Sequence, residues 1–394
     1  HEDHIGAVGY FNREAPAPVY GAPTTLALVR ERCSDIELPM PDLNILQAGE
    51  DLQIGAFHIT ALAVSHSIPD TLCLLLETDQ VKLVHSGDFR LDKNPVVGPA
   101  TDMSGLSALA DESIDLLMAD STGAISEGAN PGERAVVPAL TAIFESSPRR
   151  IFLTTFASHV QRLQVVADLS ARFGRKILLA GRGAITHARI ARDRGFAPWL
   201  DGLTIHPSEA RDTRPEALTV IMSGCQGEDH SAFWRLSHGD GRLPPVQAYD
   251  TVIHSARAVP GNEGKVAALL DVCARKGARV VDGREGVHVS GHGYKEDMRT
   301  LYNAVKPRIL MPVHGGFRHL QALADLGQQE GLAEELTPVC GNGDVLEIAA
   351  HAPPRIVGHM PVPNVLLDDH GLSLIHISEP TRLRRISYAV FCLK

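Results

Sequence analysis

The sequence lacks the features that would place the chain in a membrane or outside the cell. Its six cysteines stand far apart, which argues against a disulfide framework and against a zinc module built on paired cysteines. No apolar run reaches the roughly 18 residues of a transmembrane helix. The chain opens on charged residues with no apolar stretch behind them, so a secretory signal is also missing. We therefore expect a protein of the reducing cytoplasm with no membrane partner.

Basic residues are in the minority. The chain has 37 Lys and Arg against 47 Asp and Glu, which gives a formal net charge of -10. This balance argues against nucleic-acid binding, because phosphate contacts need Lys and Arg. It leaves room for a local basic groove, and bound divalent ions would add positive charge at a site. With 394 residues, 44% of them hydrophobic, the chain is long enough for two domains.

Histidines and aspartates gather where predicted strands end. HEDH, at residues 1–4, brings two imidazoles and a carboxylate together, which suits zinc or manganese. A solvated, charged turn is the alternative for this stretch alone. His66 follows the strand in FHITALAVSH, Asp88 follows the strand in VKLVHSGD, and Asp120 ends the strand in IDLLMAD. Strand ends are where loops commonly carry chemistry.

A denser cluster follows late in the chain. VHVSGHG contributes His288, Ser290, Gly291 and His292, and the strand RILMPVHGG delivers His314. A lone histidine at a strand end is more often structural than a ligand. Repeated polar groups at such junctions favour a metal site, because burying them without a use is costly.

The local pattern changes near Pro131. Residues 51–87 form short alternating or apolar runs that predict β-strands. After Pro131, strands such as IFLTTF, KILLA and LTVIM alternate with predicted helices, which predicts a parallel sheet covered by helices up to about Asp282. The loops GRGA and SGCQGE follow two of these strands. Each is either a phosphate-binding loop or a simple strand-to-helix turn.

These motifs together resemble the ribonuclease J family, β-CASP nucleases of the metallo-β-lactamase superfamily. The resemblance covers about Glu2 to Gly371 and rests on HEDH, VSHSIPD, HSGDF, ADST, TTFASHVQRLQ, PGNE, HVSGHG and PVHGG, in that order. It implies an α/β protein with a metallo-β-lactamase αββα core and an inserted β-CASP α/β domain. The core would occupy 1–130 and 283–350, the insertion 131–282, and the start of a linker to a C-terminal domain 351–371.

The resemblance also implies two divalent metal ions, zinc in the first instance, with manganese or magnesium as alternatives. His1 and His66 would bind one ion, Asp3, His4 and His314 the other, and Asp88 would bridge them. The bridging ligand must be anionic and reach both ions, which suits an aspartate. The first histidine of the family's HxHxDH motif has no counterpart here, because the chain starts at the second.

Further roles follow from the same resemblance. Asp3, Asp120 and His292 would be the catalytic residues, with Asp120 orienting the metal ligands by hydrogen bonding. His292 would act as a general acid, or in a purely electrostatic role, beside the scissile phosphate. The substrate phosphate next to it would be held by His288, Ser290 and Gly291.

The implied activity is hydrolysis of RNA phosphodiester bonds, by a 5'-to-3' exonuclease and endonuclease acting in RNA processing and decay. Its substrate would be single-stranded RNA with a 5'-monophosphate, and the full-length form would be a homo-oligomer. Two alternatives remain open. One is a metallo-hydrolase of a small ester or thioester, which would not need the α/β lobe. The other is a metal-poor RNA-binding scaffold, which the missing histidine favours.

Two positions and both ends depart from the family pattern. GCQGE places Cys225 where a serine hydroxyl would touch phosphate, and PVHGG places Gly316 where a carboxylate would stand near the second metal. Residues 372–394 resemble a translated sequencing adapter and are predicted to be a non-native tail; a real basic helix is the alternative. With no initiator Met, the chain is predicted to be a fragment with an unpaired sheet edge and poor solubility.

Overall fold

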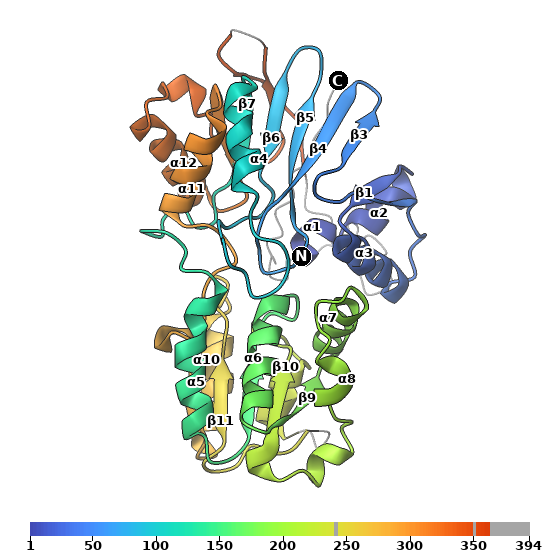
Figure 1. Ribbon diagram of the computed structural model, residues 1–394, viewed down its shortest axis with the longest axis vertical. Coiled ribbons are helices and arrows are strands. Elements are labelled where there is room, and N and C mark those ends of the chain that lie inside the picture. The colour runs from blue at the N-terminus through green and yellow to red at the C-terminus, as the bar shows by residue number, and fades with distance from the viewer. Residues whose placement is uncertain (240–242, 350–351, 363–394) are drawn as a thin grey trace, which may run out of the picture.

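Two β-sheets form the centres of two lobes that meet near the N-terminus (Figure 1). The computed structural model describes residues 1–239, 243–349 and 352–362. The predicted tail at 372–394 and the end of the predicted linker therefore lie outside the described residues. No helix within the described part of the chain is long and apolar enough to span a bilayer.

The first lobe is built on a six-stranded mixed sheet. In chain order its first four strands are antiparallel neighbours, and they lie in the range 51–87 for which β-strands are predicted. The sheet then continues with two parallel pairings, in which β7 lies between β6 and β13. In spatial order the strands are β13 (Ile309–Val313), β7 (Leu116–Asp120), β6 (Lys82–His85), β5 (Leu72–Glu77), β4 (Phe57–Ala63) and β3 (Asp51–Ile54).

Three helices cover one face of this sheet (Figure 1). Side chains alternate along β7, so Leu117 and Ala119 pack toward the helices while Leu116 and Met118 belong to a smaller cluster on the other face. The covering helices are α4 (Met103–Ala108), α11 (Lys295–Val305) and α12 (Phe317–Gln329). Because α11 and α12 come after the second lobe in the chain, the first lobe is completed only by residues beyond 290.

The second lobe is a parallel sheet between two layers of helices, as predicted. All its pairings are parallel, in the order β12 (Arg279–Val281), β11 (Thr251–His254), β8 (Ile151–Thr154), β10 (Leu218–Met222) and β9 (Lys176–Ala180). One apolar cluster joins the sheet to α5 (Val137–Ser146), α6 (Val160–Arg172) and α7 (Arg182–Asp193). Another joins the opposite face to α9 (Ala232–His238) and α10 (Glu263–Arg275).

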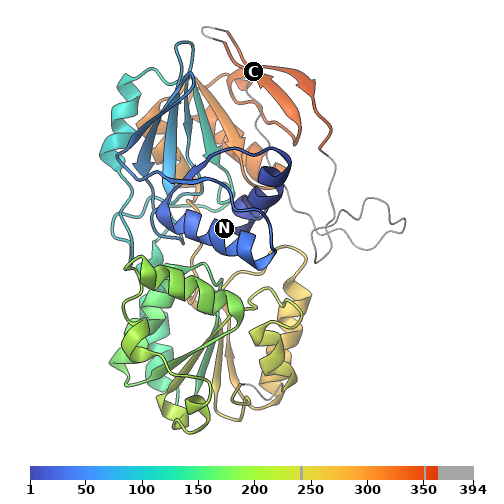
Figure 2. The ribbon, with the colours of Figure 1, turned by 90° about the vertical axis from the view of Figure 1, so that its right-hand side faces the viewer.

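The first 45 residues form a helical segment that contacts both lobes (Figure 2). Arg189 on α7 pairs with Glu31 on α3 at 2.7 Å, which ties this segment to the second lobe. It contains α1 (Glu2–Ile5), α2 (Val8–Glu14), α3 (Pro23–Asp35) and the parallel pair β1 (Val19–Gly21) and β2 (Leu43–Ile45). The remaining regular elements are α8 (Leu200–Leu203) and the antiparallel pair β14 (Asp344–Glu347) and β15 (Arg355–His359).

A buried ionic network lies where the lobes join. Arg162 on α6 donates from Nε to Glu133 Oε1 at 2.5 Å and from Nη2 to Oε2 at 3.2 Å. Arg90 of the first lobe lies 3.7 Å from the same carboxylate, and both arginines are fully buried. Burial alone would raise the pKa of Glu133, but Arg162 and His159 hold it well below its ordinary value. Glu133 is therefore charged and shared between the two lobes.

Candidate metal centre and active site

The site lies at the edge of the six-stranded sheet where its parallel strands end. Asp88 follows β6, Asp120 is the last residue of β7, and His314 follows β13. Since the carboxyl ends of parallel strands meet at one edge, these three side chains converge. His314 has a φ of 53°, an uncommon conformation for a residue with a side chain. The backbone therefore has a left-handed conformation at the residue that carries this imidazole.

The HEDH stretch reaches the same edge as the beginning of α1. His1 is the residue before the helix, and its carbonyl accepts hydrogen bonds from the N–H groups of His4 and Ile5. This first turn presents His1, Asp3 and His4 to the strand ends. The stretch therefore forms the beginning of a helix. Four residues are too few to show the helical period of apolar residues, so the sequence pattern does not predict this helix.

Two groups of side chains in this site have the arrangement of metal ligands, and they include all six predicted ligands. Within each group the ligand atoms lie within 4.8 Å of one another; the groups are His1, His66 and Asp88, and Asp3, His4 and His314. The Nε2 atoms of His1 and His66 are 2.7 Å apart. In the second group, His314 Nε2 lies 3.4 Å from Asp3 Oδ2.

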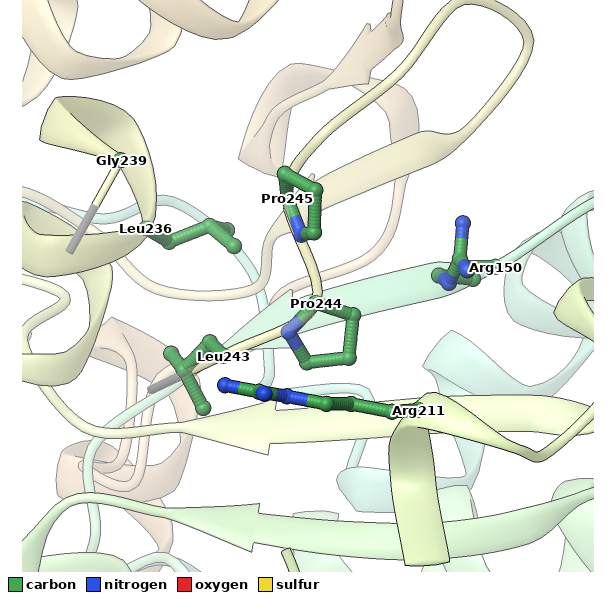
Figure 3. A pocket seen from close by; sticks show the side chains of 7 residues that line it. All are labelled: Arg150, Arg211, Leu236, Gly239, Leu243, Pro244 and Pro245. Carbon is green, nitrogen blue, oxygen red and sulfur yellow. The ribbon is translucent and has the colours of Figure 1, made fainter. Parts of the chain in front are cut away.

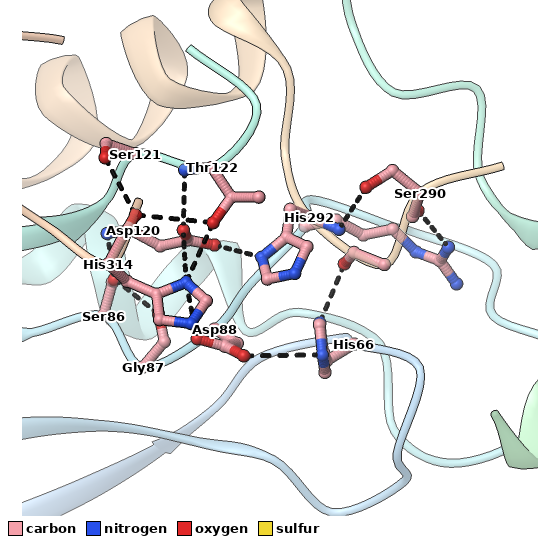
Figure 4. Close-up of polar contacts among 12 residues, drawn as sticks. His66, Ser86, Gly87, Asp88, Asp120, Ser121, Thr122, Ser290, His292 and His314 are labelled. Carbon is pink, nitrogen blue, oxygen red and sulfur yellow. Dashed lines mark hydrogen bonds and ion pairs between the residues drawn. The ribbon is translucent and has the colours of Figure 1, made fainter. Parts of the chain in front are cut away.

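Asp88 lies between His66 of the first group and His314 of the second (Figure 4). Its Oδ2 is 3.7 Å from His66 Nε2 and 3.1 Å from His4 Nε2. Its Oδ1 is 3.6 Å from His314 Nδ1. One carboxylate therefore touches ligands of both groups, as a bridging ligand must.

Hydrogen bonds behind the imidazoles fix their orientation. His66 donates from Nδ1 to the carbonyl oxygen of Gly291 at 2.8 Å, which leaves Nε2 free of a proton and facing the cluster. His1 Nδ1 and Ser158 Oγ are 2.8 Å apart, as are His314 Nδ1 and Thr122 Oγ1. Ser158 and Thr122 are not among the predicted site residues. Such supporting partners are typical of metal-binding histidines, so the residues present fit a divalent ion.

The electrostatics of the cluster favour a cation. Burial and the neighbouring His292 lower the pKa of His66 to about 3, which keeps this ring neutral as a ligand must be. Burial would also lower the pKa of His314, but Asp120 and Asp3 outweigh it and raise that pKa to about 11. The pKa of Asp88 is held well below its ordinary value by His4 and His66 against the effect of burial. The carboxylates thus attract positive charge to the place where the second group would hold an ion.

Asp120 connects the metal groups to His292. Its carboxylate is 1% exposed; Oδ2 accepts from His292 Nδ1 at 2.6 Å, and Oδ1 lies 3.3 Å from His314 Nδ1. Burial would lower the pKa of His292, but Asp120 outweighs it and raises that pKa. Asp120 thus sets the orientation of two imidazoles at once. The four residues Asp88, Asp120, His292 and His314 also lie close enough together to hold an ion.

The residues of the HVSGHG loop lie in two different surroundings. Ser290 Oγ accepts from the N–H of His292 at 3.1 Å, and Gly291 supports His66, so both lie beside the cluster. His288 lies apart from it, next to Arg162 and the other buried groups at the junction of the lobes, where burial and Arg162 lower its pKa to about 3. Its Nδ1 is buried with no hydrogen-bond partner among the described atoms.

Cys225 is closed off from solvent. Its side chain is 2% exposed, and burial raises the pKa of the thiol to about 12. Two backbone N–H groups of this loop are already used, that of Gln226 by the carboxylate of Glu228 and that of Gly227 by the carbonyl of Gly224. The loop as described therefore offers neither the thiol nor these two N–H groups to a phosphate.

A cavity of about 430 Å³ lies elsewhere in the second lobe (Figure 3). None of the predicted site residues lines it; its walls are Arg150, Arg211, Leu236, Gly239, Leu243, Pro244 and Pro245. The chemistry-bearing residues are gathered at the sheet edge instead.

Comparison with known proteins identifies the family to which the chain belongs. Residues 148–273 match the family described as ribonuclease J, beta-CASP domain, and residues 277–337 match the Zn-dependent metallo-hydrolase RNA specificity domain. Ribonuclease J of Mycobacterium tuberculosis is 36% identical over 370 residues, which cover 93% of this chain and 66% of the relative. The chain belongs to the ribonuclease J family. It therefore has the metallo-β-lactamase fold with an inserted β-CASP domain, as its motifs predict.

Other ribonuclease J proteins are similar over most of the chain. That of Synechocystis sp. is 31% identical over 94% of this chain and 59% of its own length, and ribonuclease J 1 of Streptococcus pyogenes is 31% identical over 94% and 66%. The chain spans about two thirds of these relatives or less. A crystal structure of a protein of unknown function from Enterococcus faecalis shares the fold, with a TM-score of 0.54 and 16% identity over 76% of this chain and 70% of that one. Family membership and the two ligand groups together support the use of divalent metal.

Proposed function

We propose that this protein is a metal-dependent ribonuclease that hydrolyses phosphodiester bonds of RNA. The observation that carries the proposal is the position of Asp88 between two metal-binding groups, with the Asp120 and His292 pair beside them. Two metal groups that share a carboxylate are suited to phosphoryl chemistry, because both the attacking and the leaving oxygen need charge stabilisation. Membership of the ribonuclease J family points to RNA as the substrate.

In this proposal His1, His66 and Asp88 would hold one divalent ion, and Asp3, His4, His314 and Asp88 would hold the other. The ions, when bound, supply Lewis acidity that makes water a better nucleophile and neutralises phosphate charge. Gly291, Ser158 and Thr122 keep the imidazoles in place through the hydrogen bonds behind them. Asp3 is also proposed as a catalytic residue; its Oδ2 lies 3.4 Å from His314 Nε2 in the second group.

His292 is the proposed proton donor to the leaving 3'-oxygen. Its Nδ1 is committed to Asp120, which leaves Nε2 as the nitrogen that can hand over a proton. Asp120 stabilises the protonated ring, because an adjacent carboxylate favours the charged form of an imidazole. Ser290, Gly291 and His288 are proposed to hold the neighbouring phosphate, with the Ser290 side chain adjacent to His292.

The finer assignments extend the proposal. We propose 5'-to-3' exonuclease and endonuclease activity on single-stranded RNA with a 5'-monophosphate, zinc as the first candidate metal, a cytoplasmic location and a homo-oligomeric full-length form. We also propose the division into core (1–130 and 283–350), insertion (131–282) and linker (351–371). The matched β-CASP residues, 148–273, fall inside the proposed insertion.

The decisive experiment compares three proteins on one RNA. The wild-type chain, Asp88→Ala and His58→Ala are incubated with zinc or manganese and a single-stranded RNA that carries a labelled 5'-monophosphate. His58 is a matched control, because it lies on β4 and pairs with Glu77 at 3.2 Å, outside both metal groups. Wild type and His58→Ala should release labelled mononucleotide. Asp88→Ala should lower the rate by more than about 100-fold, since losing a ligand costs more than losing a group that supports one.

Two further arms separate the alternatives. A 5'-hydroxyl RNA that yields internal fragments would reveal endonuclease cleavage, and chelator should abolish both reactions. Absence of cleavage by the wild-type chain with either metal would contradict the proposal. RNA binding without cleavage would then favour a scaffold, and turnover of a small thioester would favour a hydrolase of another class.

A further inference from the structure

We infer that Asn130 is a positioning residue for the metal centre, through hydrogen bonds from its side chain to the backbone of residues 290–292. The inference deepens the proposed function and rests on it for the identity of the reaction. Asn130 stands just before Pro131, where the chain leaves the first lobe. It is neither a metal ligand nor one of the groups assigned to substrate.

The side-chain amide of Asn130 spans two carbonyls of the HVSGHG loop. Its Nδ2 donates to Ser290 O at 2.9 Å and to His292 O at 2.7 Å. Its Oδ1 accepts from the N–H of Gly132 at 2.9 Å, so oxygen and nitrogen of the amide cannot exchange places without losing these bonds. Its backbone N–H donates to Asp297 Oδ2 at 2.7 Å, which anchors the residue to α11. Both ends of the amide and the backbone are therefore fixed.

The residue held between these two carbonyls is Gly291. Its own carbonyl points the other way and accepts the Nδ1 proton of His66. The same loop presents His292 to Asp120. Arg90 donates to Ser290 O as well, at 3.2 Å, but it reaches only one end of the loop. Among the side chains that the structure describes, that of Asn130 bonds carbonyls on both sides of Gly291, while the backbone N–H of Gly293 donates to Phe89 O at 2.6 Å.

The chemistry of the amide suits this role. An NH₂ group offers two donors from one atom, so it can satisfy two carbonyls that lie close together. A carboxylate has no donor when ionised and would place negative oxygen against both carbonyls. Asn130→Asp, which has almost the same shape, should therefore push the loop away and loosen the support of His66.

The test measures metal affinity separately from RNA cleavage. Zinc affinity is measured by competition with a chromophoric chelator for wild type, Asn130→Asp, Asn130→Ala and Asn44→Asp. Asn44 is the matched control, because its Nδ2 also donates to a carbonyl, that of Asp42 at 3.2 Å, on the surface. Asn130→Asp should weaken zinc binding about 10-fold or more, as loss of support behind a ligand does. Asn130→Ala should weaken it less, and Asn44→Asp should bind as wild type does.

Cleavage kinetics provide the second readout. For the Asn130 variants kcat should fall and KM for RNA should rise, because the loop that Asn130 holds carries His292 and the proposed phosphate-binding residues Ser290 and Gly291. Wild-type zinc affinity and kcat in both variants would overturn the inference. So would unfolding of both variants by circular dichroism, since that would assign Asn130 to the fold as a whole. Wild type that binds zinc but cleaves no RNA would overturn the RNA substrate and leave the inference standing, whereas wild type that binds no zinc would overturn both.

Discussion

Asp120 shows how much of this site depends on one buried carboxylate. It contacts the proposed proton donor through one oxygen and lies near a metal-binding imidazole through the other. Thr122 donates its backbone N–H to Oδ1 at 2.9 Å, which fixes the carboxylate further. Since both imidazoles depend on its charge, Asp120 affects the site although it is not one of the six proposed ligands.

Asp120→Asn should therefore lower kcat for RNA cleavage by about 10- to 100-fold while the fold is retained. The amide keeps the shape of the side chain but removes the charge that stabilises a protonated His292. Asp51→Asn is the control, because Asp51 also accepts a side-chain hydrogen bond, from Thr60, on an exposed strand. Equal kcat for the two variants would show that the charge of Asp120 is not used.

At this scale the sequence indicated the proposed ligands and one supporting residue, Asp120, but not the other supporting residues. The resemblance to the ribonuclease J family named all six proposed ligands, and the structure brings their side chains close together. Ser158, Thr122 and Asn130 are common residue types whose partners lie 157, 192 and 162 positions away in the chain. Nothing local marks such residues, because their role arises only when distant segments meet.

Among the elements, the junction formed by Glu133 and α6 holds the lobes together. Three charged residues, Arg90, Glu133 and Arg162, are fully buried there. A buried charge without its partner is strongly destabilising, so neutralising any one residue of the network should destabilise the fold.

The strands and long helices around the network are predictable from the period of their apolar residues. Helix α1, with four residues, is too short to show such a period.

Glu133→Gln should lower the free energy of unfolding at pH 7 by about 3–5 kcal/mol, measured by urea denaturation, because the buried Arg162 loses its counter-charge and Arg90 keeps the carboxylate of Asp92 but loses that of Glu133. Glu127→Gln, which removes an exposed partner of Lys295, should leave it nearly unchanged.

The pH dependence of this effect has a definite sign. The pKa of Glu133 is lowered below its ordinary 4.5 in the folded protein, so its stabilising effect is present above that pH and is lost as the pH falls. The difference between wild type and Glu133→Gln should therefore narrow below about pH 4.5. A difference that is constant down to pH 3 would show that the charge is not responsible.

For the molecule as a whole, the metal groups bring the first residues of the chain together with segments far along the sequence. Residues 1–4 meet residue 314 there, with Asp3 and His314 separated by 311 positions. The periodic pattern of apolar residues predicts the strands and helices within each lobe. It does not predict how the two lobes meet, because the period of a strand or helix carries no information on contacts between distant segments.

Metal should consequently stabilise the whole fold. At a free zinc concentration 100 times its Kd the expected gain is about 2.7 kcal/mol, so chelator should lower Tm by a few degrees and added zinc should restore it. His66→Ala should show a Tm that responds much less to zinc. If the Tm of wild type is the same with chelator and with zinc, the metal does not join these segments.

The pairing of β13 with β7 also sets an order of events during synthesis. The inserted lobe is complete at β12, which ends at Val281, but the first lobe still lacks β13, which pairs Val313 with Asp120. A chain growing on the ribosome must therefore carry an unfinished sheet while its neighbour folds. His314, the last of the six ligands to be made, arrives only after that. If the protein cleaves RNA as proposed, a nascent copy is inactive until residue 314 has been made.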